Sequence, residues 1–210
     1  MGICLEISEA LQKGKAKDVK ELVEKALAEG IEPGCILNTG LLAGMDIIGE
    51  KFKNNEVYVP EVLIAARAMK SGMEILQPKL NESGVEAIGK VAIGTVKGDL
   101  HDIGKNLVRM MFEGKGIEVV DLGVDVSAEK FYEAYENEGV QIIACSALLT
   151  TTMSEMKSVV EAAQGAGIRG KVKIMIGGAP VTQAYCDQIG ADSYASDAST
   201  AAELAVAFCK

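Results

Sequence analysis

The fold is decided by the stretch 91-VAIGTVKGDLHDIGKN-106, which changes its periodicity halfway along. The first six residues are mostly apolar or β-branched, as expected for a buried strand, and a helical pattern follows them. Four similar apolar runs come later, at 117–122, 141–145, 172–176 and 192–195. Helical stretches alternate with these runs. This repetition predicts a doubly wound parallel five-stranded sheet, a Rossmann-like α/β fold, over residues 90–210.

Upstream of this unit the apolar spacing is helical. The last of several apolar stripes consists of Val62, Ala65, Met69, Met73 and Leu76. Breaks at Gly14, 30–34 and 53–60 divide residues 1–80 into four helices, the fourth expected to end near Pro78. The short connections predict a four-helix bundle, and the polar, glycine-bearing segment 81–89 is the expected linker.

Composition excludes several classes of protein. Of 210 residues, 49% are hydrophobic and 24% charged, which is typical of globular chains. The formal net charge of −9 disfavours nucleic acid and anionic membranes as partners. The five cysteines are scattered without a C-x-x-C pair, and no apolar run is long enough to span a bilayer, so we expect a cytoplasmic protein.

The only histidine, His101, lies in the loop after the first predicted strand, at the end of the sheet where doubly wound folds bind ligands. The loop lacks the glycine spacings that cradle nucleotide phosphates. His101 is either an ordinary surface residue or a metal ligand whose second ring nitrogen donates to Asp99. Because a bare zinc or iron ion needs about three or four protein ligands, a metal here would arrive in a macrocycle, as haem or a corrinoid.

Three short motifs carry a resemblance to a known family. The motifs Asp99-x-His101-x-x-Gly104, Ser146-x-Leu148 and Gly177-Gly178 resemble the cobalamin-binding fingerprint of methionine synthase and of methyltransferase corrinoid proteins, at the family's spacing. The segment 44–70 resembles the helical cap that precedes the cobalamin domain in that family. A chain of this size, similar to the family over nearly its whole length, looks like a stand-alone corrinoid carrier of methanol, methylamine or betaine methyltransferase systems.

The resemblance implies that cobalamin or a related corrinoid, in methyl or hydroxo form, binds with His101 as the cobalt ligand. His101, Asp99 and Thr152 are the residues expected to act in catalysis, as an axial ligand and its relay of hydrogen bonds. Methionine synthase carries a serine at the position of Thr152. The other expected cofactor-binding residues are Asp102, Ile103, Gly104, Ser146, Leu148, Gly177 and Gly178 and, over the upper cobalt face, Phe52, Val59 and Val62.

Structural alternatives exist for most of these residues. The three cap residues fit the core of a helical bundle equally well. The glycine pair could form a simple turn before Pro180, rather than leave room for the nucleotide tail of the cofactor. Ser146 and Thr152 could cap a helix expected over 150–166.

The function that the resemblance implies is methyl transport, without catalysis by the protein alone. Co(I) accepts a methyl group from a substrate-specific corrinoid methyltransferase, and methyl-Co(III) passes it to a second methyltransferase that acts on coenzyme M or tetrahydrofolate. The implied partners are these two enzymes and a reductive activation protein. Two alternatives have the same fingerprint, the cobalamin-binding subunit of an adenosylcobalamin mutase and a cobalamin sensor. A nicotinamide-binding Rossmann domain is disfavoured, because this sequence lacks the glycine loop of such domains.

Overall fold

A computed structural model describes residues 2–210, so Met1, the first residue of the expected cap 1–80, lies outside the described residues. The chain divides into two compact units. One comprises the chain up to Ala87 together with Gly114–Gly116, and the other comprises Ile88–Glu113 and Ile117–Lys210. Across residues 2–210, no helix is both long enough and apolar enough to cross a membrane.

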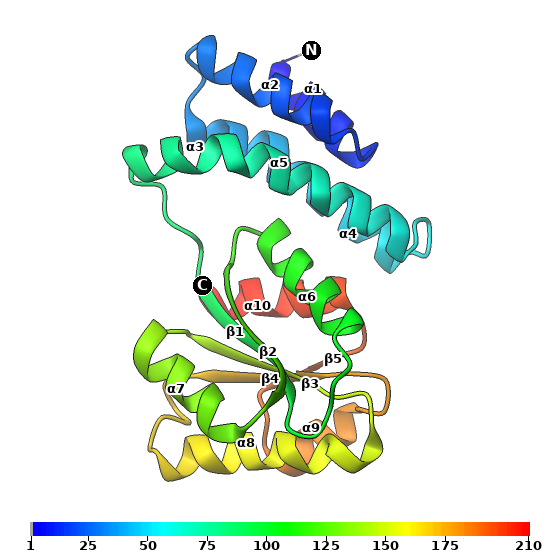
Figure 1. The fold of residues 1–210 in the computed structure, drawn as a ribbon, viewed down its shortest axis with the longest axis vertical. Coiled ribbons are helices and arrows are strands. Elements are labelled where there is room, and N and C mark those ends of the chain that lie inside the picture. Colours follow the sequence, from blue (N-terminus) through cyan, green and yellow to red (C-terminus); the bar gives the residue numbers. More distant parts are fainter. Residues whose placement is uncertain (1) are drawn as a thin grey trace. The chain divides into compact units, whose positions relative to one another are not determined.

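The first unit is helical, as expected (Figure 1). Helices α1 and α2 are followed by a continuous helical stretch, in which a π-helical segment, η1, separates the short α3 from α4, and then by the long α5. The bounds are Ile3–Gln12 for α1, Ala16–Ala28 for α2, Pro33–Cys35 for α3, Ile36–Leu42 for η1, Ala43–Lys53 for α4 and Val59–Ser83 for α5. The breaks at Gly14, 30–34 and 53–60 therefore lie where the sequence places them.

Helix α5 does not end near Pro78, and this corrects the expected linker. Leu76 and Leu80, on either side of the proline, are both buried, so the apolar stripe continues through it. The helix ends instead at Gly84, whose φ of 70° is the left-handed conformation of a helix C-cap, and the Val85 N–H donates to the carbonyl of Leu80. The first three residues of the expected linker 81–89 are thus helical.

The second unit contains five strands, all parallel, in the order β2-β1-β3-β4-β5. The strands are β1 Lys90–Val96, β2 Glu118–Val126, β3 Ile142–Ser146, β4 Lys173–Gly177 and β5 Ser193–Ala195. The helices are α6 Ile103–Gly114, α7 Ala128–Glu138, α8 Met153–Gly165, α9 Gln183–Ile189 and α10 Ala198–Cys209, and a 3₁₀ turn, η2 Thr150–Thr152, precedes α8. The predicted doubly wound five-stranded sheet is confirmed.

Helices cover both faces of this sheet (Figure 1). Helices α7, α8 and α9 lie on one face, where Phe131, Met156 and Ile189 pack against strand residues such as Ile143 and Ile176. Helices α6 and α10 lie on the other face. The chain passes from β1 outward to β2 and then returns to β3 on the opposite side of β1. The loops after β1 and β3 therefore diverge from adjacent strand ends, which is where doubly wound folds bind ligands.

Candidate functional site

The loops that follow β1 and β3 meet at the carboxylate of Asp99, which is completely buried. Its Oδ1 accepts hydrogen bonds from the Nδ1 of His101 at 2.7 Å and from the backbone N–H of His101 at 3.1 Å. Its Oδ2 accepts from the backbone N–H groups of Leu148 and Leu149, at 2.8 and 3.1 Å, and from the Oγ1 of Thr152, at 2.8 Å. One carboxylate thus joins the three residues of the expected relay and both loops.

These donors determine the charge of the site. Burial alone would raise the pKa of Asp99, but the hydrogen bonds from His101, Leu148 and Thr152 outweigh it and hold that pKa well below its usual range. Asp99 is therefore ionised at neutral pH and can only accept hydrogen bonds. Nδ1 of His101 consequently carries a proton, which leaves Nε2 as the nitrogen available to a metal.

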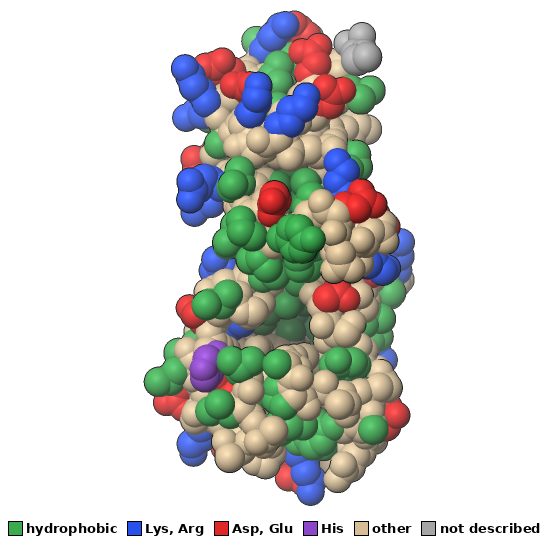
Figure 2. Space-filling model, turned by 90° about the vertical axis from the view of Figure 1, so that its right-hand side faces the viewer, with side chains coloured by type: hydrophobic (Ala, Val, Ile, Leu, Met, Phe, Trp, Pro, Cys, Tyr) green, Lys and Arg blue, Asp and Glu red, His purple; other side chains and the backbone are tan. Residues whose placement is uncertain are grey.

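His101 is oriented but accessible. Its side chain is 52% exposed, and Figure 2 shows the histidine, in purple, at the surface with hydrophobic side chains beside it. The Oγ1 of Thr95, a fully buried residue near the end of β1, donates to the carbonyl oxygen of His101 at 2.8 Å. Sequence reasoning missed Thr95, although a hydroxyl within an otherwise apolar buried strand was a usable signal.

Exposed apolar side chains come from the same two loops and from the first residue of α6. Ile103, 79% exposed, and Leu148 are members of the expected set, and the structure adds Leu100 and Leu149, which sequence reasoning missed. Several large apolar side chains exposed to solvent in the same region mark a binding surface. The position of Leu100 and Leu149 in loops at the ligand end of the sheet was the signal that could have identified them. The chemistry suits a broad, largely apolar ligand that presents a metal to His101.

A row of small side chains lies on the sheet face beneath α6 and α10. Strand register aligns Thr95, Ser146, Gly177 and Ala195, one from each of four adjacent strands. Their neighbours Cys145, Ile176 and Tyr194 pack on the opposite face, so alternation places the row on this one. At the start of α6, a Cβ added to Gly104 would meet nothing within 4 Å. Together with a free imidazole nitrogen, this arrangement fits a corrinoid, whose slender nucleotide tail needs such room.

The two positions of the glycine pair differ in what surrounds them. Gly178 has a φ of 133°, and a Cβ there would overlap the carbonyl of Ala147. At Gly177 a Cβ would lie 3.3 Å from the carbonyl oxygen of Ala195. The backbone N–H of Ala147 also donates to the carbonyl of Gly177, at 3.2 Å. Gly178 is therefore required by the close approach of the chain after β3, and this requirement does not depend on a cofactor tail.

The helix-capping alternative for Thr152 is not supported. Thr152 immediately precedes α8, yet its side chain makes no capping hydrogen bond to that helix. Its hydroxyl lies instead between the Asp99 carboxylate and the carbonyl of Leu149, at 2.8 and 2.9 Å. Asp102, by contrast, lies immediately before α6, and its carboxylate accepts a hydrogen bond from the side-chain amide of Asn106 in that helix at 3.1 Å.

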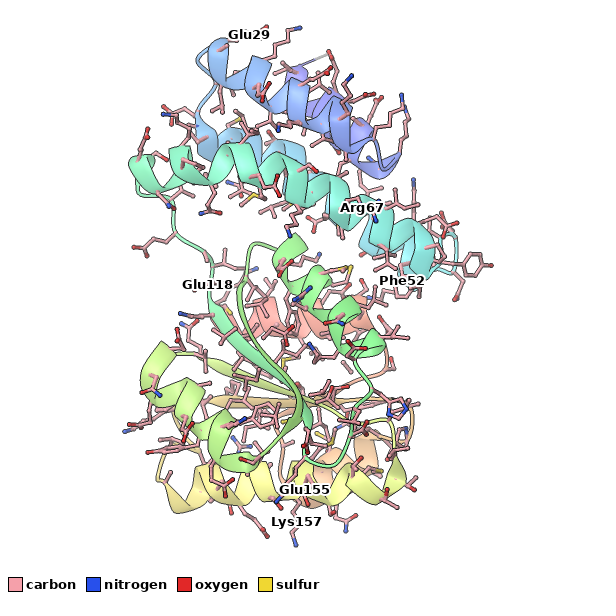
Figure 3. All side chains as sticks on the ribbon, viewed as in Figure 1. Glu29, Phe52, Arg67, Glu118, Glu155 and Lys157 are labelled. Atoms are coloured by element: carbon pink, nitrogen blue, oxygen red, sulfur yellow. The ribbon has the colours of Figure 1, made fainter. Side chains whose placement is uncertain are left out.

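The three residues expected over the cobalt differ in exposure within the helical unit. Val62 is completely buried, on the α5 stripe that continues through Ala65, Met69 and Leu76. Burial of this kind is what the core alternative predicts for Val62. Val59 and Phe52 are half-buried. Phe52 lies in the last turn of α4 (Figure 3).

Comparisons with known proteins agree with this site. Two family models match the chain, both described as a B12 binding domain, over residues 89–205 and 4–77. The chain is 39% identical to a corrinoid protein from Desulfitobacterium hafniense over 208 residues, which is 98% of this chain and 96% of the relative. It is 46% identical to trimethylamine corrinoid protein 1 from Methanosarcina acetivorans over 180 residues, which is 85% of this chain and 83% of the relative.

Solved structures give the same result. The methanol:cobalamin methyltransferase complex MtaBC from Methanosarcina barkeri contains a chain that matches with a TM-score of 0.88 at 31% identity, over 99% of this chain and 79% of that one. A cobalamin-binding protein from Desulfitobacterium hafniense matches with a TM-score of 0.82 at 28% identity, over 98% of both chains. With the Asp99 site, these matches show that the chain belongs to the family of cobalamin-binding corrinoid proteins of methyltransferase systems.

Proposed function

We propose that this protein is a methyl carrier that is loaded by one methyltransferase and unloaded by another. The single observation that carries the proposal is the buried Asp99 carboxylate, which holds His101 with one ring nitrogen oriented and the other free. The bound corrinoid supplies a cobalt centre that can take up and give up a methyl group. Relatives named for trimethylamine and dimethylamine support a role in methyl transfer from small methylated substrates.

His101 acts as the cobalt ligand through Nε2, and Asp99 and Thr152 control that ligand. The ionised Asp99 accepts the Nδ1 proton of His101 at 2.7 Å. This bond fixes the tautomer and the orientation of the ring, so Nε2 would be the nitrogen presented to cobalt. The Thr152 hydroxyl and the backbone N–H groups of Leu148 and Leu149 keep Asp99 ionised, so this carboxylate would hold His101 in the same orientation with or without bound cobalt.

The two units have separate roles in this proposal. Residues 88–210 would bind the corrinoid, and the row formed by Thr95, Ser146, Gly177 and Ala195, with Gly104, would accommodate its nucleotide tail. The helical unit, to Ser83, would act as a cap whose residues Phe52, Val59 and Val62 shield the cobalt, and residues 84–89 would be the linker. The partners are a substrate-specific methyltransferase, a second methyltransferase specific for coenzyme M or tetrahydrofolate, and a reductive activation protein.

Electron paramagnetic resonance of the Co(II) form tests the ligand assignment. The full chain is loaded with cobalamin, and the nitrogen hyperfine splitting is compared between natural-abundance protein and protein carrying ¹⁵N-histidine. We expect one corrinoid per chain and a splitting that changes with the label, since His101 is the only histidine. A splitting that changes only when the dimethylbenzimidazole of the cofactor is labelled would contradict the assignment.

Methyl transfer is tested separately, with partners captured from native cells on the methylcobalamin-loaded protein and identified by mass spectrometry. The expected result is a methyltransferase that removes the methyl group from the wild-type protein and does so more slowly from H101A. Loading of the protein with an adenosyl ligand in the cell, and no demethylation by any captured methyltransferase, would favour the mutase subunit or the sensor instead.

A further inference from the structure

Asp125, near the end of β2, has a backbone conformation that is unusual for a residue with a side chain. Its φ is 54°, in the left-handed region. Among the described residues other than glycine, only Asn55 shares this feature. Such a conformation is strained for most residues and is retained where surrounding contacts require it. The cause therefore lies in what Asp125 contacts.

The register of β2 against β1 shows how Asp125 reaches its position. Ile93 pairs with Asp121, Gly94 with Gly123 and Val96 with Val126, so β2 has two more residues than β1 over this interval. The two register shifts are bulges, which bend an edge strand and redirect its side chains. The second shift includes Asp125 and brings it over the turn that follows β1.

Asp125 makes two hydrogen bonds to that turn, one with its side chain and one with its backbone. Its Oδ1 accepts from the backbone N–H of Gly98 at 2.7 Å, and its own N–H donates to the carbonyl of Asp99 at 3.0 Å. The turn closes through the bond from the Asp99 N–H to the carbonyl of Val96, at 3.1 Å. Gly98, with a φ of 78°, occupies its third position, as in a type II turn, and the N–H of that residue has no partner within such a turn.

We propose that Asp125 is a positioning residue that fixes the Val96–Asp99 turn and thereby sets the orientation of the Asp99 carboxylate toward His101. It acts through the backbone of Gly98 and Asp99 and touches neither ring nitrogen of His101. The strain at Asp125 is the consequence of making both hydrogen bonds from one residue. The test of this inference by the Co(II) spectrum rests on the proposed function. The tests by hydrogen exchange and NMR of the cofactor-free chain do not.

Three substitutions separate the side-chain bond from the backbone strain. D125N keeps an oxygen acceptor and a residue type that tolerates positive φ. D125G relieves the strain but removes the acceptor, and D125A removes the acceptor while retaining the strain. N55G is the matched control, because it relieves the same strain in the turn before α5, where φ is 59°.

Amide hydrogen exchange and ¹⁵N NMR of the full chain without cofactor provide the first readout. In D125G and D125A we expect the Gly98 N–H to exchange about tenfold faster, since its only side-chain acceptor is lost. We also expect the His101 ring nitrogen shifts to move toward those of a histidine with mixed tautomers. D125N should stay within about threefold of wild type in exchange, and N55G should leave both signals unchanged.

The Co(II) spectrum of the cobalamin-loaded protein provides the second readout. The ratio of histidine-ligated to histidine-free cobalt should fall about fivefold in D125G and recover in D125N. A faster Gly98 N–H with unchanged His101 shifts and an unchanged ratio would overturn the proposal, because the turn would then be loosened without effect on the ligand. If wild-type protein bound no corrinoid, the proposed function would fail, and the His101 shifts of the cofactor-free variants would still decide the role of Asp125.

Discussion

The hydroxyl of Thr152 donates a hydrogen bond of 2.8 Å to the carboxylate of Asp99, across 53 positions of sequence. Both side chains are buried, Asp99 completely. The contact joins the loop after β1 to the turn before α8, so it links the position of His101 to the other side of the site. A charged acceptor makes such a bond stronger than one between neutral groups.

The change T152V tests this bond at nearly constant shape. With valine, the Oδ2 of Asp99 keeps its two backbone N–H donors and loses the hydroxyl donor. We expect a loss of about 1.5 kcal/mol in the free energy of unfolding. The control T152S keeps the hydroxyl and removes one methyl group, at a cost of about 0.8 kcal/mol. Urea unfolding of the cofactor-free chain measures both, and a serine variant less stable than the valine variant would show that the methyl group, not the hydroxyl, stabilises the site.

The change D99N replaces a group that accepts five hydrogen bonds by one that has a single acceptor oxygen. Either His101 or the Leu148, Leu149 and Thr152 donors must then face an NH₂ group, and we expect a loss of about 2 kcal/mol or more at pH 7. Because the pKa of Asp99 is lower in the folded than in the unfolded protein, its contribution is complete above about pH 4 and declines as the pH falls toward the folded pKa. The stability difference between wild type and D99N should therefore shrink below about pH 4, as measured by urea unfolding over pH. A constant difference would mean that the charge of Asp99 does not contribute.

The sequence predicted the elements that depend on residue type. Apolar runs located all five strands, and the resemblance to the cobalamin-binding fingerprint singled out Asp99, His101 and Thr152, which the structure joins in one network. The hydrogen bonds from the backbone N–H groups of Leu148 and Leu149 to Asp99 could not be predicted in the same way. A backbone N–H group is present whatever the side chain, so residue type gives no signal for such a bond. The positive φ of Asp125 arises from strand register, which local sequence does not determine.

Other differences have causes in tertiary packing. Pro78 is a poor helix residue, but the buried leucines on both sides of it keep α5 helical until Gly84. Apolar periodicity could not distinguish a core valine from one that faces a cofactor, and only the structure shows that Val62 is completely buried. At Gly178 the sequence indicated a need for glycine but not its reason, the neighbouring carbonyl of Ala147.

The segment between α5 and β1 should be the first place at which a protease cuts the folded protein. Glu86 is exposed in the non-helical part of this segment, whereas Glu82 lies within α5. We expect a glutamate-specific protease to cleave first after Glu86, and E86Q to slow that cleavage at least about tenfold, since proteases act on exposed backbone that is free to leave its structure. Mass spectrometry of the early fragments identifies the site. Initial cleavage elsewhere would place the mobile connection outside 84–89.

The change G178A should be among the most destabilising in the α/β unit. The new methyl group would overlap the Ala147 carbonyl, and alanine at a φ of 133° is strained in any surroundings. A loss of about 3 kcal/mol or more in the free energy of unfolding is expected, in the absence of any cofactor. Unfolding of the cofactor-free chain measures it. A stable G178A variant that fails only in cobalamin binding would restore the view that this glycine makes room for the cofactor tail.

The change G104A should separate stability from binding. Gly104 lies in the first turn of α6 with an ordinary helical φ, and an added Cβ meets nothing within 4 Å, so alanine should stabilise the cofactor-free chain by about 0.5 kcal/mol. Glycine is unfavourable in a helix, so its presence at position 104 needs another reason. The row of small side chains on the same face of the sheet indicates that this reason is space for the cofactor. We expect G104A to weaken cobalamin binding about tenfold or more, because one methyl group in an occupied space costs about 1–3 kcal/mol. Thermal unfolding of the cofactor-free chain and spectroscopic titration with cobalamin measure the two effects. Unchanged affinity with raised stability would show that the corrinoid does not pass beside Gly104.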